Sequence, residues 1–157
     1  MTADGLHAAS ATRDITPEAP QQLSGFGPGS LERVSTGVHS PLNATALVVD
    51  DGETRVALAS LDLLNVTREF TSTVRERVAD LGFDAMTLVA THTHSAPYVP
   101  GELLEINPLL SYTADTSAYV DETIDATVDA IQEATERLEP ATLRVGRAEN
   151  EDVLWNR

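Results

Sequence analysis

Arg55-Val-Ala-Leu-Ala-Ser-Leu61 and Met86-Thr-Leu-Val-Ala90 are the two apolar stretches that decide the fold, and each predicts a β-strand. A helix is predicted between them, with Thr67 as its N-cap and Gly82 just beyond its end. Its apolar stripe consists of Phe70, Val74, Val78 and Leu81. A strand, a helix and a strand in this order predict a βαβ unit. Its two strands are then parallel, so their carboxyl ends share one edge of the sheet.

Further elements are predicted on both sides of this unit. They are a strand at Leu6–Ala11 closed by a turn at Arg13–Pro17, a strand at Ala44–Asp50 followed by an Asp51-Gly52 hairpin turn, a helix over about 118–138 ended by Pro140, and a strand at Thr142–Gly146. The inward face of that helix is expected to hold Val120, Ile124, Val128, Ile131 and Leu138. Residues 18–42 and 95–116 are predicted as long irregular loops, which are more often functional than passive. The expected fold is α/β, a mixed β-sheet with a βαβ unit and flanking helices.

Composition excludes several classes of function. Acidic residues outnumber basic ones by 25 to 10, and the 157-residue chain carries a formal net charge of −15. This balance argues against nucleic acid or an anionic membrane as a partner, because both bind basic faces. The chain has no cysteine, so disulfides and thiol chemistry are absent. No apolar run is long enough to span a bilayer, and no signal peptide is recognisable, so a cytoplasmic location is expected unless the start is misassigned.

The acidic residues are concentrated on the second predicted helix. Asp121, Asp125 and Asp129 follow one another at a spacing of four residues. Like charges at this spacing destabilise a helix by roughly 0.2–0.5 kcal/mol per pair in dilute buffer. Salt at about 1 M shortens the Debye length to ~3 Å and screens this repulsion. Together with the absence of lysine, the pattern favours a halophilic protein over an ordinary acidic one.

The segment with the clearest chemical signal is Thr91-His-Thr-His-Ser-Ala-Pro97, directly after a predicted strand. Alternate residues of an extended segment point to the same side, so His92 and His94 are expected to face one point. Two converging imidazoles suit a zinc ion, or one ligand and a proton carrier. The structural alternative is a pair of hydrogen-bonded loop histidines.

Four other polar residues have a functional or a structural interpretation. Asp62 ends the neighbouring parallel strand and is expected near His92, where it orients an imidazole or polarises water; the alternative is a loop carboxylate that leads into the helix. His39 follows the Gly-rich loop and is a second candidate for proton transfer, with a plain turn residue as the alternative. Asp14 is interpreted as a structural turn residue, and His7 as a packing residue within a strand.

Several stretches together resemble the amino-terminal part of the neutral/alkaline, non-lysosomal ceramidases. The specific element is Ala90-Thr-His-Thr-His-Ser-Ala-Pro97, and the supporting ones are Asp14-Ile-Thr-Pro17, Gly37-Val-His-Ser-Pro-Leu42 and Leu58-Ala-Ser-Leu-Asp62. Their order and spacing are similar across nearly the whole chain. Residues 1–157 are therefore interpreted as the amino-terminal portion of a ceramidase-like catalytic domain, and as an incomplete domain.

The resemblance implies a zinc-dependent amidase of sphingolipid metabolism, which cleaves the N-acyl bond of ceramide into a sphingoid base and a fatty acid. It implies His92 as a zinc ligand and His94 as a group for proton transfer or transition-state stabilisation. The family's remaining ligands, a second His, a Glu and a Tyr, come from segments farther along the chain. A missing carboxyl-terminal segment or chain is therefore an expected partner, besides a lipid-like N-acyl substrate.

The sequence departs from the family at Ala96-Pro-Tyr-Val-Pro100, where a Gly-rich stretch is usual. Two other functions therefore stay open beside the amidase. One is an inactive fragment or binding module that keeps the family fold without the metal. The other is a metal-dependent esterase or phosphoesterase.

Overall fold

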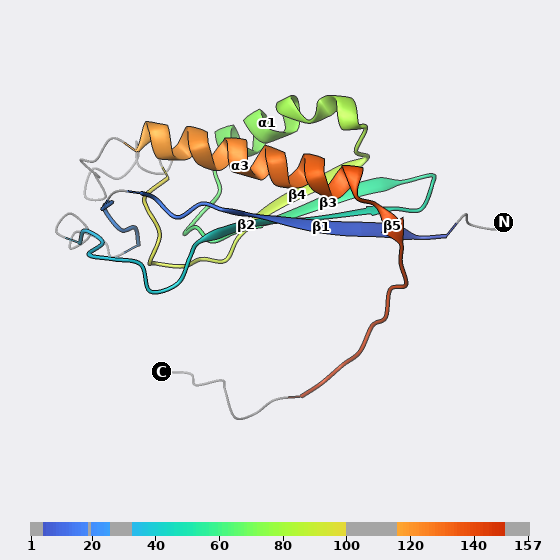
Figure 1. Cartoon of the computed structure of the whole chain (residues 1–157), viewed down its shortest axis with the longest axis horizontal. Helices are drawn as coiled ribbons and strands as arrows, with labels where there is room; N and C mark the ends of the chain where they lie inside the picture. The colour runs from blue at the N-terminus through green and yellow to red at the C-terminus, as the bar shows by residue number, and fades with distance from the viewer. Residues whose placement is uncertain (1–4, 19, 26–32, 100–115, 150–157) are drawn as a thin grey trace.

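A computed structural model of the chain describes residues 5–18, 20–25, 33–99 and 116–149 (Figure 1). Its elements, in order, are β1 His7–Asp14, β2 Asn43–Asp50, β3 Arg55–Leu61, α1 Arg68–Arg77, the short 3-10 helix η2 Ala79–Leu81, β4 Ala85–Ala90, α3 Ser117–Glu136 and β5 Glu139–Pro140. The five strands form one sheet in the order β4-β3-β2-β1-β5, and both α-helices lie on the same face of it (Figure 1). The α/β fold with a mixed sheet is confirmed.

The predicted βαβ unit is present. β3 and β4 pair in parallel, from Val56 beside Ala85 to Leu61 beside Ala90. All other strand pairs are antiparallel, so β1, β3 and β4 run in the same direction. Their carboxyl ends, together with the start of β2, therefore form one edge of the sheet.

The helix of this unit begins and ends as its sequence predicts. The Thr67 side chain accepts a hydrogen bond from the Phe70 backbone N–H, 3.1 Å away, which satisfies one free donor of the first turn. The α-helical part ends at Arg77, and the chain completes the turn as η2. Gly82 then adopts a left-handed conformation at φ 68°, which a side chain would disfavour.

The core lies between the helices and the covered face of the sheet. The strands contribute mostly small residues there, Ala11, Ala44, Ala46, Ala57 and Ala59, which let α3 pack close across β1 and β2. Of the residues predicted to face inward from α3, Ile124, Val128 and Ile131 are buried, while Val120 and Leu138 are partly buried against the core. Buried threonines on the same helix, Thr123 and Thr127, donate their hydroxyls to backbone carbonyls of the preceding turn.

Residues 142–146 do not form a strand, so that prediction is wrong. The last strand is the two-residue β5, which pairs with His7 and Ala8 of β1. The chain then runs away from the sheet (Figure 1), and the side chains of Leu143 and Val145 are 77% and 92% exposed. An alternating pattern forms a strand only where a partner strand lies alongside, and none does so among the described residues.

The first strand is longer than predicted. It extends to Asp14, because every residue from His7 onward pairs with β2. The turn predicted at Arg13–Pro17 therefore starts only after Asp14.

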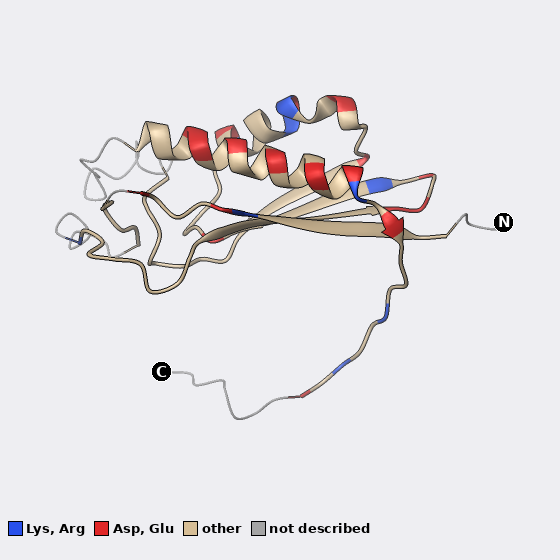
Figure 2. Cartoon of the chain, in the orientation of Figure 1, with Lys and Arg blue, Asp and Glu red and all other residues tan. Residues whose placement is uncertain are grey.

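Charge is distributed unevenly over the fold (Figure 2). Helix α3 carries acidic side chains along its exposed side, and Asp125 and Glu133 form ion pairs with Arg77 and with Arg13 and Arg137. No helix among the described residues is both long and apolar enough to cross a membrane.

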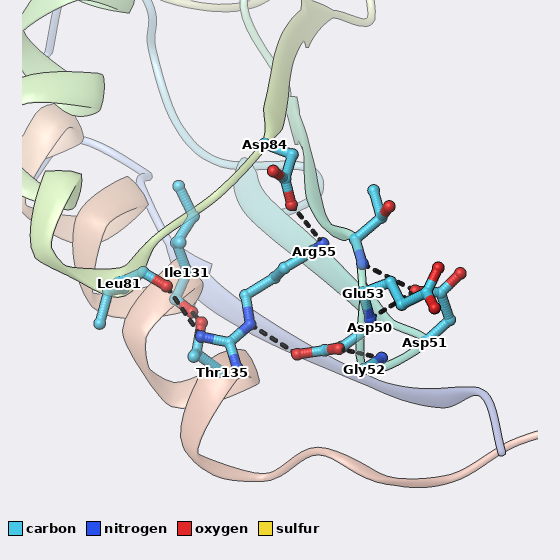
Figure 3. A network of polar contacts seen from close by, with 10 residues as sticks. Asp50, Asp51, Gly52, Glu53, Arg55, Leu81, Asp84, Ile131 and Thr135 are labelled. Atoms are coloured by element: carbon cyan, nitrogen blue, oxygen red, sulfur yellow. Dashed lines mark hydrogen bonds and ion pairs between the residues drawn. The ribbon is translucent and has the colours of Figure 1, made fainter. Parts of the chain in front are cut away.

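A polar network closes the β2–β3 hairpin (Figure 3). The Arg55 guanidinium donates to the Asp50 carboxylate, 2.7 Å away, and to the Leu81 carbonyl, 2.8 Å away. The Gly52 N–H donates to the other oxygen of Asp50. This N–H and then Arg55 hold the pKa of Asp50 below its ordinary value. Through the bond from Arg55 to the Leu81 carbonyl, the network links the β2–β3 hairpin to the end of the α1–η2 segment.

Candidate active site

The stretches singled out in the sequence meet at one edge of the sheet. Asp14 ends β1, Asn43 begins β2, Asp62 follows β3, and Thr91 follows β4. The carboxyl edge of parallel strands is where α/β proteins commonly bind ligands. The topology thus brings residues that are far apart in the sequence to one place.

Asp62 connects three of these strand ends. Its Oδ2 accepts a hydrogen bond from the Asn43 backbone N–H at 3.0 Å, and its Oδ1 accepts one from the Thr91 hydroxyl at 3.2 Å. Its own N–H donates to the Asn43 carbonyl. The sequence placed Asp62 beside His92, and the structure places it against the preceding residue. Its contacts hold the edge together, and the imidazole of His92 is oriented by a different group.

That group is a backbone carbonyl. His92 Nδ1 lies 2.9 Å from the Leu64 carbonyl oxygen, which can only accept a hydrogen bond. Nδ1 therefore carries the proton, and in the neutral imidazole the lone pair is on Nε2. Metal-binding histidines are held in this way, with one nitrogen donating to a carbonyl and the other facing the metal.

The backbone of His92 is also unusual. Its φ is 64°, and it is the single non-glycine residue with a positive φ in the described part of the chain. A non-glycine residue in this region is strained, and such strain is concentrated at functional sites. The neighbouring bonds keep the conformation in place, since Thr91 and Thr93 donate their N–H groups to the carbonyls of Leu61 and Leu63.

His94 lies beside His92. The two ring centroids are 5.4 Å apart and the rings are nearly perpendicular, at 85°. His92 is exposed and His94 is half-buried. The two imidazoles therefore lie close together, although the left-handed backbone of His92 is not the extended conformation on which their expected common direction was based.

A cleft of about 740 Å³ opens at the same edge. Asp62 and His39 line it, together with Thr93 and Ser95, the residues that alternate with the two histidines. The apolar part of its wall is formed by Pro17, Pro20, Leu23, Val34, Val38, Leu42 and Pro97. His92 and His94 are not among its described lining residues, so the structure brings the histidine pair and the Asp62–His39 pair to one edge without joining them in one cavity.

His39 is exposed within this wall. Its Nδ1 lies 3.0 Å from the Ser40 hydroxyl. The loop that carries His39 is held by the Asp14-Ile-Thr-Pro17 stretch. The Leu42 N–H donates to the Thr16 hydroxyl, and the Ile15 N–H donates to the Leu42 carbonyl.

His7 lies within a strand as predicted, whereas Asp14 is the last residue of β1 and not part of the turn. The Asp14 carboxylate accepts a hydrogen bond from the Thr16 N–H at 2.7 Å, and hydrogen bonding with Thr16 lowers its pKa. His7 is part of the β1 ladder, opposite Asp50. Both positions have structural contacts and lie outside the histidine pair.

The described residues do not form a complete metal centre. Within 5–18, 20–25, 33–99 and 116–149, no three His, Asp or Glu side chains gather around one point. His92 has the orientation of one ligand. A catalytic zinc usually has three protein ligands, and the described residues do not bring three together.

Sequence reasoning missed two residues that shape this site. One is Leu64, whose carbonyl orients His92; nothing in an apolar loop residue signals such a role. The other is Gly25, whose backbone packs against the His94 ring. The Gly-rich composition of residues 25–29 was a signal for close backbone approach, but not for its target.

The fold is shared with known ceramidases. The chain superposes on a structure described as "Ceramidase complexed with C2" with a TM-score of 0.71 and 24% identity over 87% of this chain. It superposes on the neutral ceramidase from Pseudomonas aeruginosa with a TM-score of 0.70 and 26% identity, again over 87% of this chain. In both cases the match covers 22% of the ceramidase, so the chain spans about a fifth of their length. A search of curated proteins gave no match.

The sequence itself carries the family signature. Residues 8–157 match the family described as neutral/alkaline non-lysosomal ceramidase, N-terminal. Because this match includes nearly the whole chain, the protein belongs to that family, and the resemblance seen in its motifs is confirmed.

Proposed function

We propose that this chain supplies the amino-terminal part of the active site of a zinc-dependent hydrolase, which cleaves the N-acyl amide bond of ceramide or a related N-acyl lipid. The observation that carries the proposal is the orientation of His92. Its Nδ1 donates to the Leu64 carbonyl, so Nε2 is available to a metal ion, and His94 stands beside it. Family membership and the shared fold support the reaction class.

In this proposal each residue has one task. His92 Nε2 is a zinc ligand, and bound zinc would polarise the amide carbonyl and lower the pKa of water. His94 accepts a proton from the attacking water and passes it to the leaving amine nitrogen, as a general base and then a general acid. His39 and Asp62 line the cleft together with apolar side chains, and this mixed lining suits a lipid-like substrate with a polar head.

The incomplete ligand set defines what the chain does alone. With a single well-oriented ligand in the described residues, we expect weak zinc binding and no amidase turnover from the isolated 157-residue chain. In this respect the isolated chain behaves as the inactive fragment that the sequence left open. We expect the remaining ligands to come from outside the described residues.

A chimera tests the reaction. In it, this chain replaces the matched fifth of the Pseudomonas aeruginosa neutral ceramidase, and the product is assayed with N-acyl amide, ester and phosphate substrates. We expect amide hydrolysis that His92→Ala abolishes and that His7→Ala, a change in the β1 ladder, leaves intact. Hydrolysis of the ester alone would overturn the amidase assignment in favour of the esterase.

Metal binding tests the ligand without the need for a chimera. Cobalt or zinc titration of the isolated chain is expected to show weak binding that is lost in His92→Ala and kept in His39→Ala. Equal affinity in His92→Ala and the unmodified chain would contradict the assignment of His92 as a ligand.

A further inference from the structure

The backbone of Gly25 lies against the imidazole of His94. A side chain at position 25 would have its Cβ 2.7 Å from His94 Cε1 and 2.8 Å from Cγ, closer than real Cβ contacts. Gly25 also has a φ of +89°, which residues with a side chain rarely adopt. Two independent features, the space and the backbone angle, therefore require glycine here.

Neighbouring contacts fix the position of Gly25 relative to His94. Leu23 forms a β-bridge with Pro97, and the Ser24 N–H and hydroxyl both point to the Ala96 carbonyl, at 3.2 and 3.4 Å. Ser24 is fully buried. Residues 23–25 are thus attached to the segment that carries His94, and His94 lies two residues before the attachment point at Ala96.

We infer that Gly25 is a positioning residue, whose bare backbone sets the plane and the distance of the His94 imidazole from His92. His94 is half-buried and lies in the loop after β4, four residues beyond the end of that strand. The backbone of Gly25 packs against its ring, and the centroid of the His92 ring lies 5.4 Å from the centroid of the His94 ring. The inference rests on the proposed function for its meaning, because there His94 is the residue that transfers the proton.

A matched glycine elsewhere separates this role from simple backbone strain. Gly52 has nearly the same left-handed angle, φ +86°, and has nothing within 4 Å of an added Cβ. Gly25→Ala and Gly52→Ala therefore both place a side chain at a left-handed φ of nearly the same value, and only the first also meets His94.

The experiment uses the 157-residue chain and needs neither zinc nor substrate, so it can fail independently of the proposed function. Imidazole ring signals are recorded by NMR at one pH for the unmodified chain, Gly25→Ala and Gly52→Ala. We expect the His94 signals to move in Gly25→Ala and to stay in place in Gly52→Ala. Unchanged His94 signals in a folded Gly25→Ala would overturn the inference.

Thermal unfolding in a double-mutant cycle gives the second readout. Gly25→Ala is expected to lower the melting temperature more than Gly52→Ala does, and the excess should disappear when His94→Ala makes room. An excess that persists without the imidazole would contradict the contact. If Gly25→Ala does not fold in either background, a nuclear Overhauser effect between the Gly25 α-protons and the His94 ring in the unmodified chain decides, and its absence overturns the inference.

Discussion

The carboxylate of Asp62 accepts a hydrogen bond from the hydroxyl of Thr91, 3.2 Å away, across the parallel strands β3 and β4. Its second oxygen accepts the Asn43 N–H at the start of β2. This one carboxylate thereby links the ends of β3 and β4 to the start of β2, directly before His92 in the chain. The strained backbone of His92 depends on its neighbours for support, and this bond fixes the residue that precedes it.

Removal of this carboxylate should cost stability. Asp62→Ala leaves the Asn43 N–H and the Thr91 hydroxyl without their acceptor, and we expect a loss of about 1–3 kcal/mol in the free energy of unfolding. Thr91→Val removes one donor and should cost about 0.5–1.5 kcal/mol. Urea denaturation measures both, and Asp80→Ala, an exposed change in η2, is the control. Additive costs in the double variant would show that the two side chains do not interact.

The hairpin network in Figure 3 predicts a graded response at Arg55. Arg55→Ala loses both the Asp50 pair and the bond to the Leu81 carbonyl, with an expected cost of about 1–2 kcal/mol. Arg55→Lys keeps a positive charge for Asp50 but cannot reach both acceptors with one planar group, so an intermediate cost is expected. Equal stability of Arg55→Lys and the unmodified chain in urea would show that the Leu81 bond contributes nothing.

The sequence predicted the elements whose signals are local. Thr67 and Gly82 bound the α1–η2 segment because capping depends on a few adjacent residues. The parallel pairing of β3 and β4 followed from the strand–helix–strand order. The prediction of a strand at residues 142–146 was wrong because strand formation depends on a partner strand, which a sequence pattern does not supply.

The site was predictable in its position and less so in its contacts. The histidine pair follows from one contiguous stretch, and the topology placed Asp62 at the same edge. The group that orients His92 is a carbonyl of Leu64, and the residue that packs on His94 is Gly25. Both act through the backbone, so their side chains carry no signal of the role.

The acidic surface in Figure 2 predicts a dependence on salt. Asp121, Asp125 and Asp129 repeat along α3, and among these three described residues only Asp125 forms an ion pair, with Arg77. Screening relieves more repulsion than it weakens attraction, so we expect the melting temperature to rise from dilute buffer into molar KCl.

A charge-removing variant shows whether this column is responsible. Asp129→Asn should raise stability in dilute buffer by roughly 0.2–0.5 kcal/mol per repulsive pair removed and should reduce the salt dependence. Arg77→Ala should lower stability in dilute buffer. A melting temperature that is flat or falls with KCl would refute the halophilic interpretation.

High pH should unfold the protein through Tyr119. This residue at the start of α3 is 5% exposed, and burial raises its pKa to about 12 from an ordinary value of 10.0. The neutral form is therefore favoured in the folded state, while the unfolded chain ionises first. The stability linked to this residue is fully present below pH 10.0 and is lost as the pH rises toward about 12. Within that window the expected loss is at most roughly 1.4 kcal/mol per pH unit.

Urea denaturation at a series of pH values measures this loss, with Tyr119→Phe as the matched variant that keeps the ring and cannot ionise. The difference between the two proteins should be constant below pH 10.0 and should shift in favour of Tyr119→Phe above it; parallel curves across the whole range would show that Tyr119 titrates like an exposed tyrosine.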